Sequence, residues 1–209
     1  NAVSIATARF IHPSAKQCIV ISPGRAESYL KYQELIFDLF NNGFSVFVID
    51  HRGQGLSQRI IGDPFKGYVE DFQYYVDDLK TFIDRTVLPH CQKPPLLLAH
   101  SMGGAIAIRL MQQFPQLIEA ATLSSPMIAI SSGGLPHWLA KGVITFGHKL
   151  NKLLKQEAWY FAGQGPYQPH SFEGNSLSHS LVRHKIFADL YQSTPELQLG
   201  GVTFQWLHR

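Results

Sequence analysis

The segment Leu96-Leu-Leu-Ala-His-Ser-Met-Gly-Gly104 places a serine between a predicted strand and a predicted helix. An apolar run of strand length leads directly into Ser101, and a helix is predicted from about Met102 to Gln113. Such a turn holds the serine in a strained conformation, with its hydroxyl above the edge of a sheet. Because strand and helix approach closely there, the residues two before and two after the serine must be small. Ala99 and Gly103 meet that requirement.

Ser101 also lies at a helix N-terminus, where the helix dipole and free N–H groups favour a developing oxyanion. The Met102 N–H is one expected donor. The second is expected from Pro23-Gly24-Arg25, the loop after an earlier strand, with the Arg25 backbone N–H as donor and Gly24 as a substrate contact. The alternatives are a helix start capped by serine and an ordinary strand-to-helix turn. The flanking strand and helix favour the catalytic interpretation.

The periodicity of apolar residues extends this pattern along the chain. Strands are predicted at 6–11, 17–22, 44–49, 96–99 and 120–124, and amphipathic helices at about 32–40, 71–87 and 102–113. Strands that alternate with helices predict an α/β fold, with a mostly parallel sheet and helices on both faces. We assign 1–132 to the N-terminal part of this core. The buried-strand pattern is missing from 133–201, so 133–209 is predicted to be a helical cap and the start of a return to the core.

Composition limits the classes of protein that remain. The 209 residues are 45% hydrophobic and 16% charged, which excludes a disordered chain. No apolar run approaches the roughly 18 residues of a membrane span. The formal net charge of +3 is too small to suggest nucleic acid, and all of it lies after residue 132. The two cysteines, Cys18 and Cys91, are too few for a disulfide framework or a zinc cluster, and they agree with a reducing compartment.

The predicted cap contains one long amphipathic helix. Its apolar stripe consists of Leu139, Val143, Phe146, Leu150 and Leu153, and four lysines lie mostly on the other face, at 141, 149, 152 and 155. Two interpretations stay open: an ordinary cover with a solvated basic face, and a surface that contacts an anionic membrane.

Other candidate sites are weaker. Gly53-x-Gly55 lacks the third glycine and the following helix of a dinucleotide loop, so it is interpreted as a turn that Asp50 and His51 organise. His100 and Glu27 are predicted to be structural. The cap histidines, at 137, 148, 170, 179, 184 and 208, show no metal-ligand spacing, and neither a metal nor a cofactor is predicted.

Five segments carry a resemblance to a known family: Ser22-Pro-Gly-Arg-Ala-Glu-Ser-Tyr-Leu-Lys-Tyr32, Asp50-His-Arg-Gly-Gln-Gly-Leu-Ser57, Leu98-Ala-His-Ser-Met-Gly-Gly-Ala-Ile-Ala107, Ser124-Ser-Pro-Met127 and Gly200-Gly-Val-Thr-Phe-Gln-Trp206. The chain resembles the α/β-hydrolases, and more narrowly the bacterial lysophospholipases related to monoacylglycerol lipases and serine aminopeptidase-type hydrolases. This resemblance implies a serine esterase that removes the acyl chain of a lysophospholipid through an acyl-enzyme on Ser101. It also implies a cap whose apolar inner face receives the acyl chain, and peripheral association with the cytoplasmic side of the bacterial inner membrane.

The chain departs from the family pattern after the serine. The fold orders its catalytic triad as serine, acid and histidine, and no position here takes the last two roles. Asp189 and His208 are only formal candidates. We therefore expect the chain to be an N-terminal portion of a longer enzyme. Alone it should be essentially inactive, with a turnover about six decades below that of the whole enzyme. It should also have an unpaired sheet edge at 120–124. The rival functions are another serine hydrolase (monoacylglycerol lipase, carboxylesterase or aminopeptidase) and a non-catalytic hydrolase-fold binding module.

Overall fold

A five-stranded sheet organises the chain, as seen in a computed structural model that describes residues 3–131, 134–154, 156–169, 171–175 and 178–208. The strands are β1 (Thr7–Phe10), β2 (Gln17–Ser22), β3 (Phe44–Ile49), β4 (Leu96–His100) and β5 (Ala120–Ser124), in the order β1-β3-β2-β4-β5. β1 pairs antiparallel with β3, and the other pairs are parallel. The predicted α/β fold with a mostly parallel sheet is confirmed.

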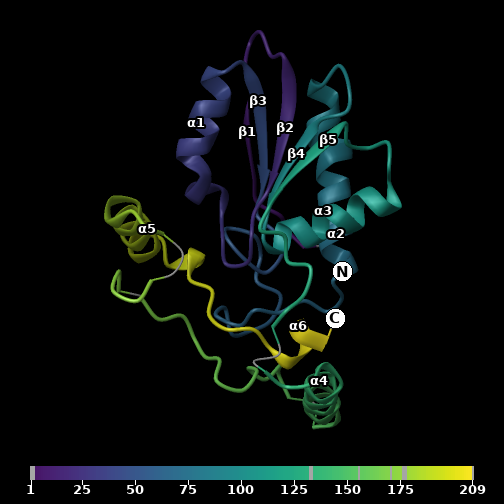
Figure 1. Cartoon of the computed structure of the whole chain (residues 1–209), viewed down its shortest axis with the longest axis vertical. Coiled ribbons are helices and arrows are strands. Elements are labelled where there is room, and N and C mark those ends of the chain that lie inside the picture. The colour runs from purple at the N-terminus through teal and green to yellow at the C-terminus, as the bar shows by residue number, and fades with distance from the viewer. Residues whose placement is uncertain (1–2, 132–133, 155, 170, 176–177, 209) are drawn as a thin grey trace.

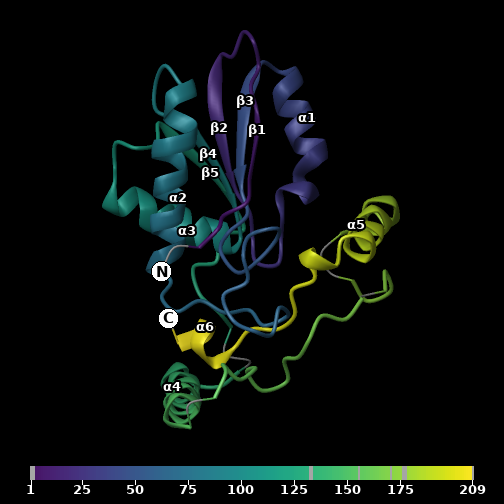
Figure 2. The same cartoon turned by 180° about the vertical axis from the view of Figure 1, so that it is seen from behind.

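Helices cover both faces of the sheet (Figure 1). α1 (Gln33–Asn41) lies on one face, and α2 (Gln73–Phe82) and α3 (Met102–Gln113) lie on the other, as the reverse view also shows (Figure 2). The short helix η1 (Tyr29–Tyr32) precedes α1, a π-helical turn η2 (Ile83–Val87) extends α2, and the 3₁₀ turn η3 (Leu88–His90) follows it. Gly43 ends α1 with a φ of 86°, a conformation in which a side chain would be strained.

The larger core lies between the sheet and α2 and α3. β2 is buried along all six residues and β3 along five, because helices cover both faces of these central strands. β5 is different: four of its five residues are exposed, and within the described residues it pairs only with β4. The predicted unpaired edge at this strand is thereby confirmed.

The cap helices lie beyond the end of the sheet at which β2, β3 and β4 stop (Figure 1). They are α4 (His137–Leu153), α5 (Leu181–Ser193) and α6 (Phe204–His208), with the 3₁₀ turn η4 (Pro195–Leu197) between the last two. The predicted boundary at 132/133 falls on residues outside the described part of the chain, so it stays a prediction. No described helix is long and apolar enough to cross a membrane.

The apolar stripe predicted for the long cap helix is largely exposed. Of the predicted stripe, Leu139, Val143, Phe146 and Leu153 are 37%, 45%, 69% and 77% exposed, and Trp138 beside it is 75% exposed, whereas Gly147 and Asn151 are the buried residues of α4. α4 packs on α6, and a Cβ added at Gly147 would lie 2.5 Å from the ring of Phe204. The helix is therefore held by a narrow face of small and polar residues. Lys155, at the end of the predicted basic face, lies outside the described residues.

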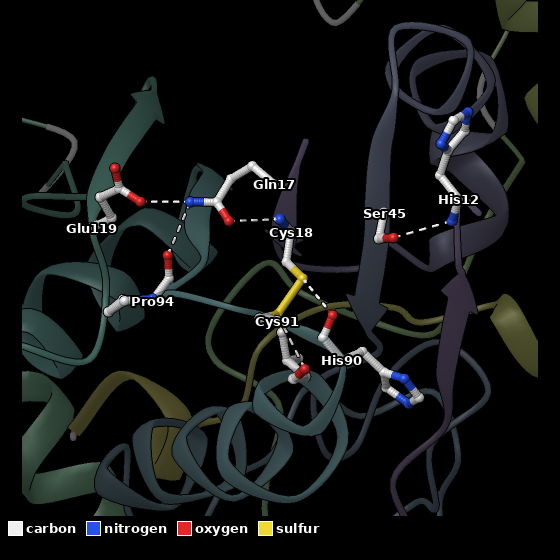
Figure 3. The surroundings of a disulfide bond; sticks show 9 residues. His12, Gln17, Cys18, Ser45, His90, Cys91, Pro94 and Glu119 are labelled. Carbon is white, nitrogen blue, oxygen red and sulfur yellow. Dashed lines mark hydrogen bonds between the residues drawn. A yellow bond between two sulfur atoms is a disulfide. The ribbon is translucent and has the colours of Figure 1, made fainter. Parts of the chain in front are cut away.

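Cys18 and Cys91 form a disulfide (Figure 3). Their Cα atoms are 5.9 Å apart although 73 positions separate them in the sequence. The sequence predicted no disulfide framework and did not indicate this single bond. The turn η3 brings Cys91 to the amino end of β2, the end opposite Ser22, and no local sequence pattern indicates this approach.

Candidate active site

Ser101 occupies the turn between β4 and α3 with a φ of 50° and a ψ of −116°. A non-glycine residue with positive φ is strained, and it persists only where its surroundings enforce it. Here the Ser101 N–H donates to the Ser124 carbonyl at 3.0 Å, and the Ser101 carbonyl accepts from the Met127 N–H at 2.9 Å. The end of β5 and the segment after it therefore fix the serine backbone from both sides.

The close approach expected around Ser101 is present. A Cβ added at Gly103 would lie 2.1 Å from the Ser22 carbonyl oxygen and 2.5 Å from that of Pro23. Ala99 pairs with Ser22 in the sheet and is fully buried. A small residue is thus required at position 103, because α3 packs directly on the backbone at the end of β2.

The loop at 23–26, which we call the oxyanion loop, starts at this contact. The Gly24 N–H donates to Glu27 Oε2 at 2.6 Å, and the Gly24 carbonyl accepts from Gln54 Nε2 at 2.8 Å. Ala26 has a φ of 57°, and its N–H donates to Gln54 Oε1 at 3.3 Å. Among the described residues, none accepts a hydrogen bond from the Arg25 N–H. The loop therefore offers one free backbone donor between neighbours whose N–H groups are both occupied.

The roles predicted for Met102, Arg25 and Gly24 stay predictions, and the geometry agrees with the first two. The first N–H groups of a helix have no intrahelical acceptor, so the Met102 N–H is available at the start of α3. The Arg25 N–H is available in the adjoining loop. Gly24 uses its N–H and carbonyl within the protein, and Glu27 and His100 lie against its Cα, so the geometry does not support a substrate contact there.

Glu27 anchors the loop through a buried carboxylate. Burial raises the pKa of Glu27, but hydrogen bonds from His100, Lys31 and Tyr32 outweigh that effect and lower the pKa to about 2. The His100 Nδ1 lies 3.1 Å from Glu27 Oε2, so the structure places both residues in one supporting network beside the serine. Glu27 is therefore ionised at neutral pH, and its carboxylate interacts with four donors: the Gly24 N–H and the side chains of Lys31, Tyr32 and His100.

Asp50 and His51 organise the neighbouring turn, as predicted. The Asp50 carboxylate accepts the Tyr29 N–H at 2.6 Å and the Leu56 N–H at 2.8 Å. His51 is fully buried, its Nε2 lies 3.0 Å from Ser22 Oγ, and burial lowers its pKa to about 4. His51 is consequently neutral at physiological pH.

No described side chain exchanges a hydrogen bond with the Ser101 hydroxyl. Asp189 is exposed on α5, and the His208 ring stacks on His148 with 4.4 Å between ring centroids. The structure therefore places both formal triad candidates in the cap. Within the described residues, no group of three or more His, Cys, Asp or Glu side chains is placed to hold a metal ion. His170 lies outside the described residues.

Sequence reasoning missed two residues that support the site. Gln54 is buried and holds the oxyanion loop through both ends of its amide. Tyr191 of α5 donates from its hydroxyl to the Ala26 carbonyl. Gln54 stood within a quoted motif and could have been found there, but Tyr191 lies 165 positions from Ala26 and has no local signal.

Comparisons with known proteins agree with this geometry. The family model described as Serine aminopeptidase, S33 matches residues 13–209. Lysophospholipase L2 of Escherichia coli (strain K12) is 38% identical over 199 residues, which make up 95% of this chain and 57% of that protein. Probable lysophospholipase L2 of Haemophilus influenzae is 36% identical over 208 residues, covering 99% of this chain and 64% of that protein. The chain thus spans about three fifths of the length of these relatives.

A solved structure shows the same fold. The monoglyceride lipase of Saccharomyces cerevisiae, solved as a soluble variant with a substrate analogue, superposes with a TM-score of 0.67 at 20% identity. The superposition covers all of this chain and 64% of that one. The sheet and the helices on its faces therefore have the fold of an α/β-hydrolase.

Proposed function

The chain belongs to the serine aminopeptidase S33 family, and from that premise we propose that the whole protein is a serine esterase that hydrolyses lysophospholipids. The observation that carries the ester chemistry is Ser101, strained at φ 50° beside two available backbone N–H groups. The lysophospholipid substrate is supported by the names of the two bacterial relatives.

In the proposed reaction, the Ser101 Oγ attacks the carbonyl carbon of the acyl ester and loses its proton to a general base. The Met102 and Arg25 N–H groups bind the carbonyl oxygen as it becomes negative. The C–O bond to the glycerol then breaks, the deacylated phospholipid leaves with a proton, and water hydrolyses the acyl-enzyme. Removal of one oxyanion donor lowers kcat by a factor on the order of 10²–10³. The base and acid have no assigned residue within the described part of the chain.

The test uses the whole protein with lysophosphatidylcholine, and measures released fatty acid and labelling by a fluorophosphonate probe. We expect both in the wild type and neither in Ser101→Ala, with a loss on the order of six decades in kcat. Ser14→Ala, on an exposed loop, is the matched control and should behave as wild type. Preference for a monoacylglycerol would favour another esterase of this fold. Absence of labelling at Ser101 would contradict the proposal and favour a binding module.

We also propose that α4 contacts an anionic lipid surface and that the protein acts peripherally at the cytoplasmic face of the bacterial inner membrane. Trp138, Phe146 and Leu153 are large, exposed apolar side chains on α4, and Lys149 and Lys152 lie on the same helix. Large apolar side chains flanked by lysines suit the boundary between headgroups and acyl chains.

Co-sedimentation with phosphatidylglycerol vesicles tests this membrane contact. Trp138→Ala combined with Phe146→Ala should release the protein into the supernatant, and high salt should weaken binding of the wild type. Phe37→Ala is the matched control, because Phe37 is 67% exposed but lies on α1. Equal binding by the double variant and the control would contradict the contact. Salt extraction of a cell membrane fraction tests the location, and recovery from the periplasm alone would contradict it.

A further inference from the structure

The oxyanion loop is held in a conformation that its own sequence does not favour. Ala26 adopts a φ of 57°, a left-handed conformation that brings the Cβ of an alanine too close to the following carbonyl oxygen. Such a conformation persists only where the surrounding structure supplies enough contacts to enforce it. The neighbours of this loop therefore decide where the free Arg25 N–H points.

One set of contacts comes from the core. Gln54, which is 2% exposed, bonds both the Gly24 carbonyl and the Ala26 N–H. Glu27 binds the Gly24 N–H at 2.6 Å. These residues follow the loop directly or belong to the neighbouring turn, so they hold it in any position of the cap.

The second set comes from the cap. The Tyr191 hydroxyl, on α5, donates to the Ala26 carbonyl. The Arg25 Nη2 donates to the Gly200 carbonyl, and the guanidinium carbon lies 5.9 Å from the ring centroid of Trp206. The strained residue and its neighbour are thus both tied to the segment at 191–206.

The Tyr191 hydroxyl and the Arg25 guanidinium are both suited to donate to these carbonyl groups. Burial is the main cause that raises the pKa of Tyr191, and the negative charge of Glu27 raises it further. The Tyr191 hydroxyl therefore stays protonated and remains a donor. Burial lowers the pKa of Arg25, and among the described residues no carboxylate pairs with its guanidinium. In the part of the chain that the structure describes, the guanidinium has one acceptor, the Gly200 carbonyl, so displacement of the cap would leave a buried cation without a partner.

We infer that Tyr191 and the side chain of Arg25 are positioning residues that couple the cap to the oxyanion hole. The cap holds Ala26 and Arg25 so that the Arg25 N–H faces the reacting carbonyl, and displacement of α5 turns this donor away. This inference rests on the proposed esterase function. On this inference, the cap controls the rate of acyl transfer as well as covering the site.

The test is Tyr191→Phe in the whole protein, which removes one hydroxyl and keeps the ring stacked on Tyr167 at 5.9 Å. The expected result is a kcat lowered about tenfold, a KM within about twofold of wild type, and fluorophosphonate labelling slowed in parallel with kcat. Rates are expressed per labelled serine, so that unfolded protein does not count. Tyr167→Phe is the matched control and should keep the wild-type kcat, because the Tyr167 hydroxyl bonds to no described residue.

Arg25→Met provides the second arm. It keeps the backbone N–H and the length of the side chain but removes the donor to Gly200, so kcat should fall by a similar factor. Wild-type kcat per labelled site in Tyr191→Phe, or a change in KM alone, would overturn the coupling. Failure of the wild-type protein to label and to release fatty acid would instead overturn the proposed function, so the two failures are distinguishable.

Discussion

Replacing Gly103 with alanine would test the closest contact around Ser101. The added Cβ would lie 2.1 Å from the Ser22 carbonyl oxygen, 2.5 Å from the Pro23 carbonyl oxygen and 2.7 Å from the Ser22 carbonyl carbon. All three are backbone atoms, so no side-chain rotation can relieve the overlap. Real Cβ atoms essentially never come within 3.0 Å of such neighbours, so α3 and the oxyanion loop must separate by about 0.9 Å.

That separation has a stability cost and a catalytic cost. Overpacking against a rigid backbone should lower the free energy of unfolding by about 3 kcal/mol, and the Tm should fall with it. The same movement separates Ser101 from the Arg25 N–H by nearly the same distance. A displacement of about 1 Å costs on the order of 10² in rate, so kcat should fall about a hundredfold.

Thermal unfolding and fatty-acid release measured on the whole protein would check both numbers. Gly142→Ala is the matched control, because no atom lies within 4 Å of its added Cβ inside α4. Alanine is favoured over glycine in a helix interior, so this control should gain about 0.5–1 kcal/mol. If Gly103→Ala unfolded and turned over like the wild type, the close packing described for this turn would be wrong.

Three other results are expected. Because the pKa of Glu27 is lowered to about 2 from an ordinary value of 4.5, its ionised carboxylate adds about 3 kcal/mol to the free energy of unfolding. This contribution is complete above pH 4.5 and disappears as the pH falls towards 2. Urea unfolding should therefore show a smaller loss of stability between pH 5 and pH 3 in Glu27→Gln than in the wild type; equal losses would contradict the assignment. Reduction of the Cys18–Cys91 disulfide, which closes a 73-residue separation, should cost about 4 kcal/mol. A reductant should then lower the Tm of the wild type but not that of a variant with serine at both positions. The largely buried Arg52 donates two hydrogen bonds, at 2.6 and 2.7 Å, to the Asp78 carboxylate. Asp78→Asn removes that charge, so denaturant titration should show a free energy of unfolding lowered by about 3 kcal/mol. A loss below about 1 kcal/mol would contradict this prediction.

Local sequence was sufficient for the core elements because their signals are periodic. The apolar run at 44–49 predicted β3 as it is observed, and the helix predicted from Met102 to Gln113 matches α3. The serine turn was equally readable, since a strand, a serine, a small residue and a helix follow one another within a few positions. The stripe on α4 was also identified from its spacing, but its exposure was not, because periodicity does not say what a helix face packs against.

By itself, the sequence determined the succession of strands and helices along the chain, the place of Ser101 and the need for a small residue at 103. These depend on backbone preferences and on contacts between residues near one another along the chain. The tertiary structure alone decided that Cys91 meets Cys18 and that Tyr191 holds Ala26. Such contacts join residues 73 and 165 positions apart, and they depend on the path of the folded chain between them. Spacing cannot encode that path, which is why the supports of the oxyanion loop became visible only in three dimensions.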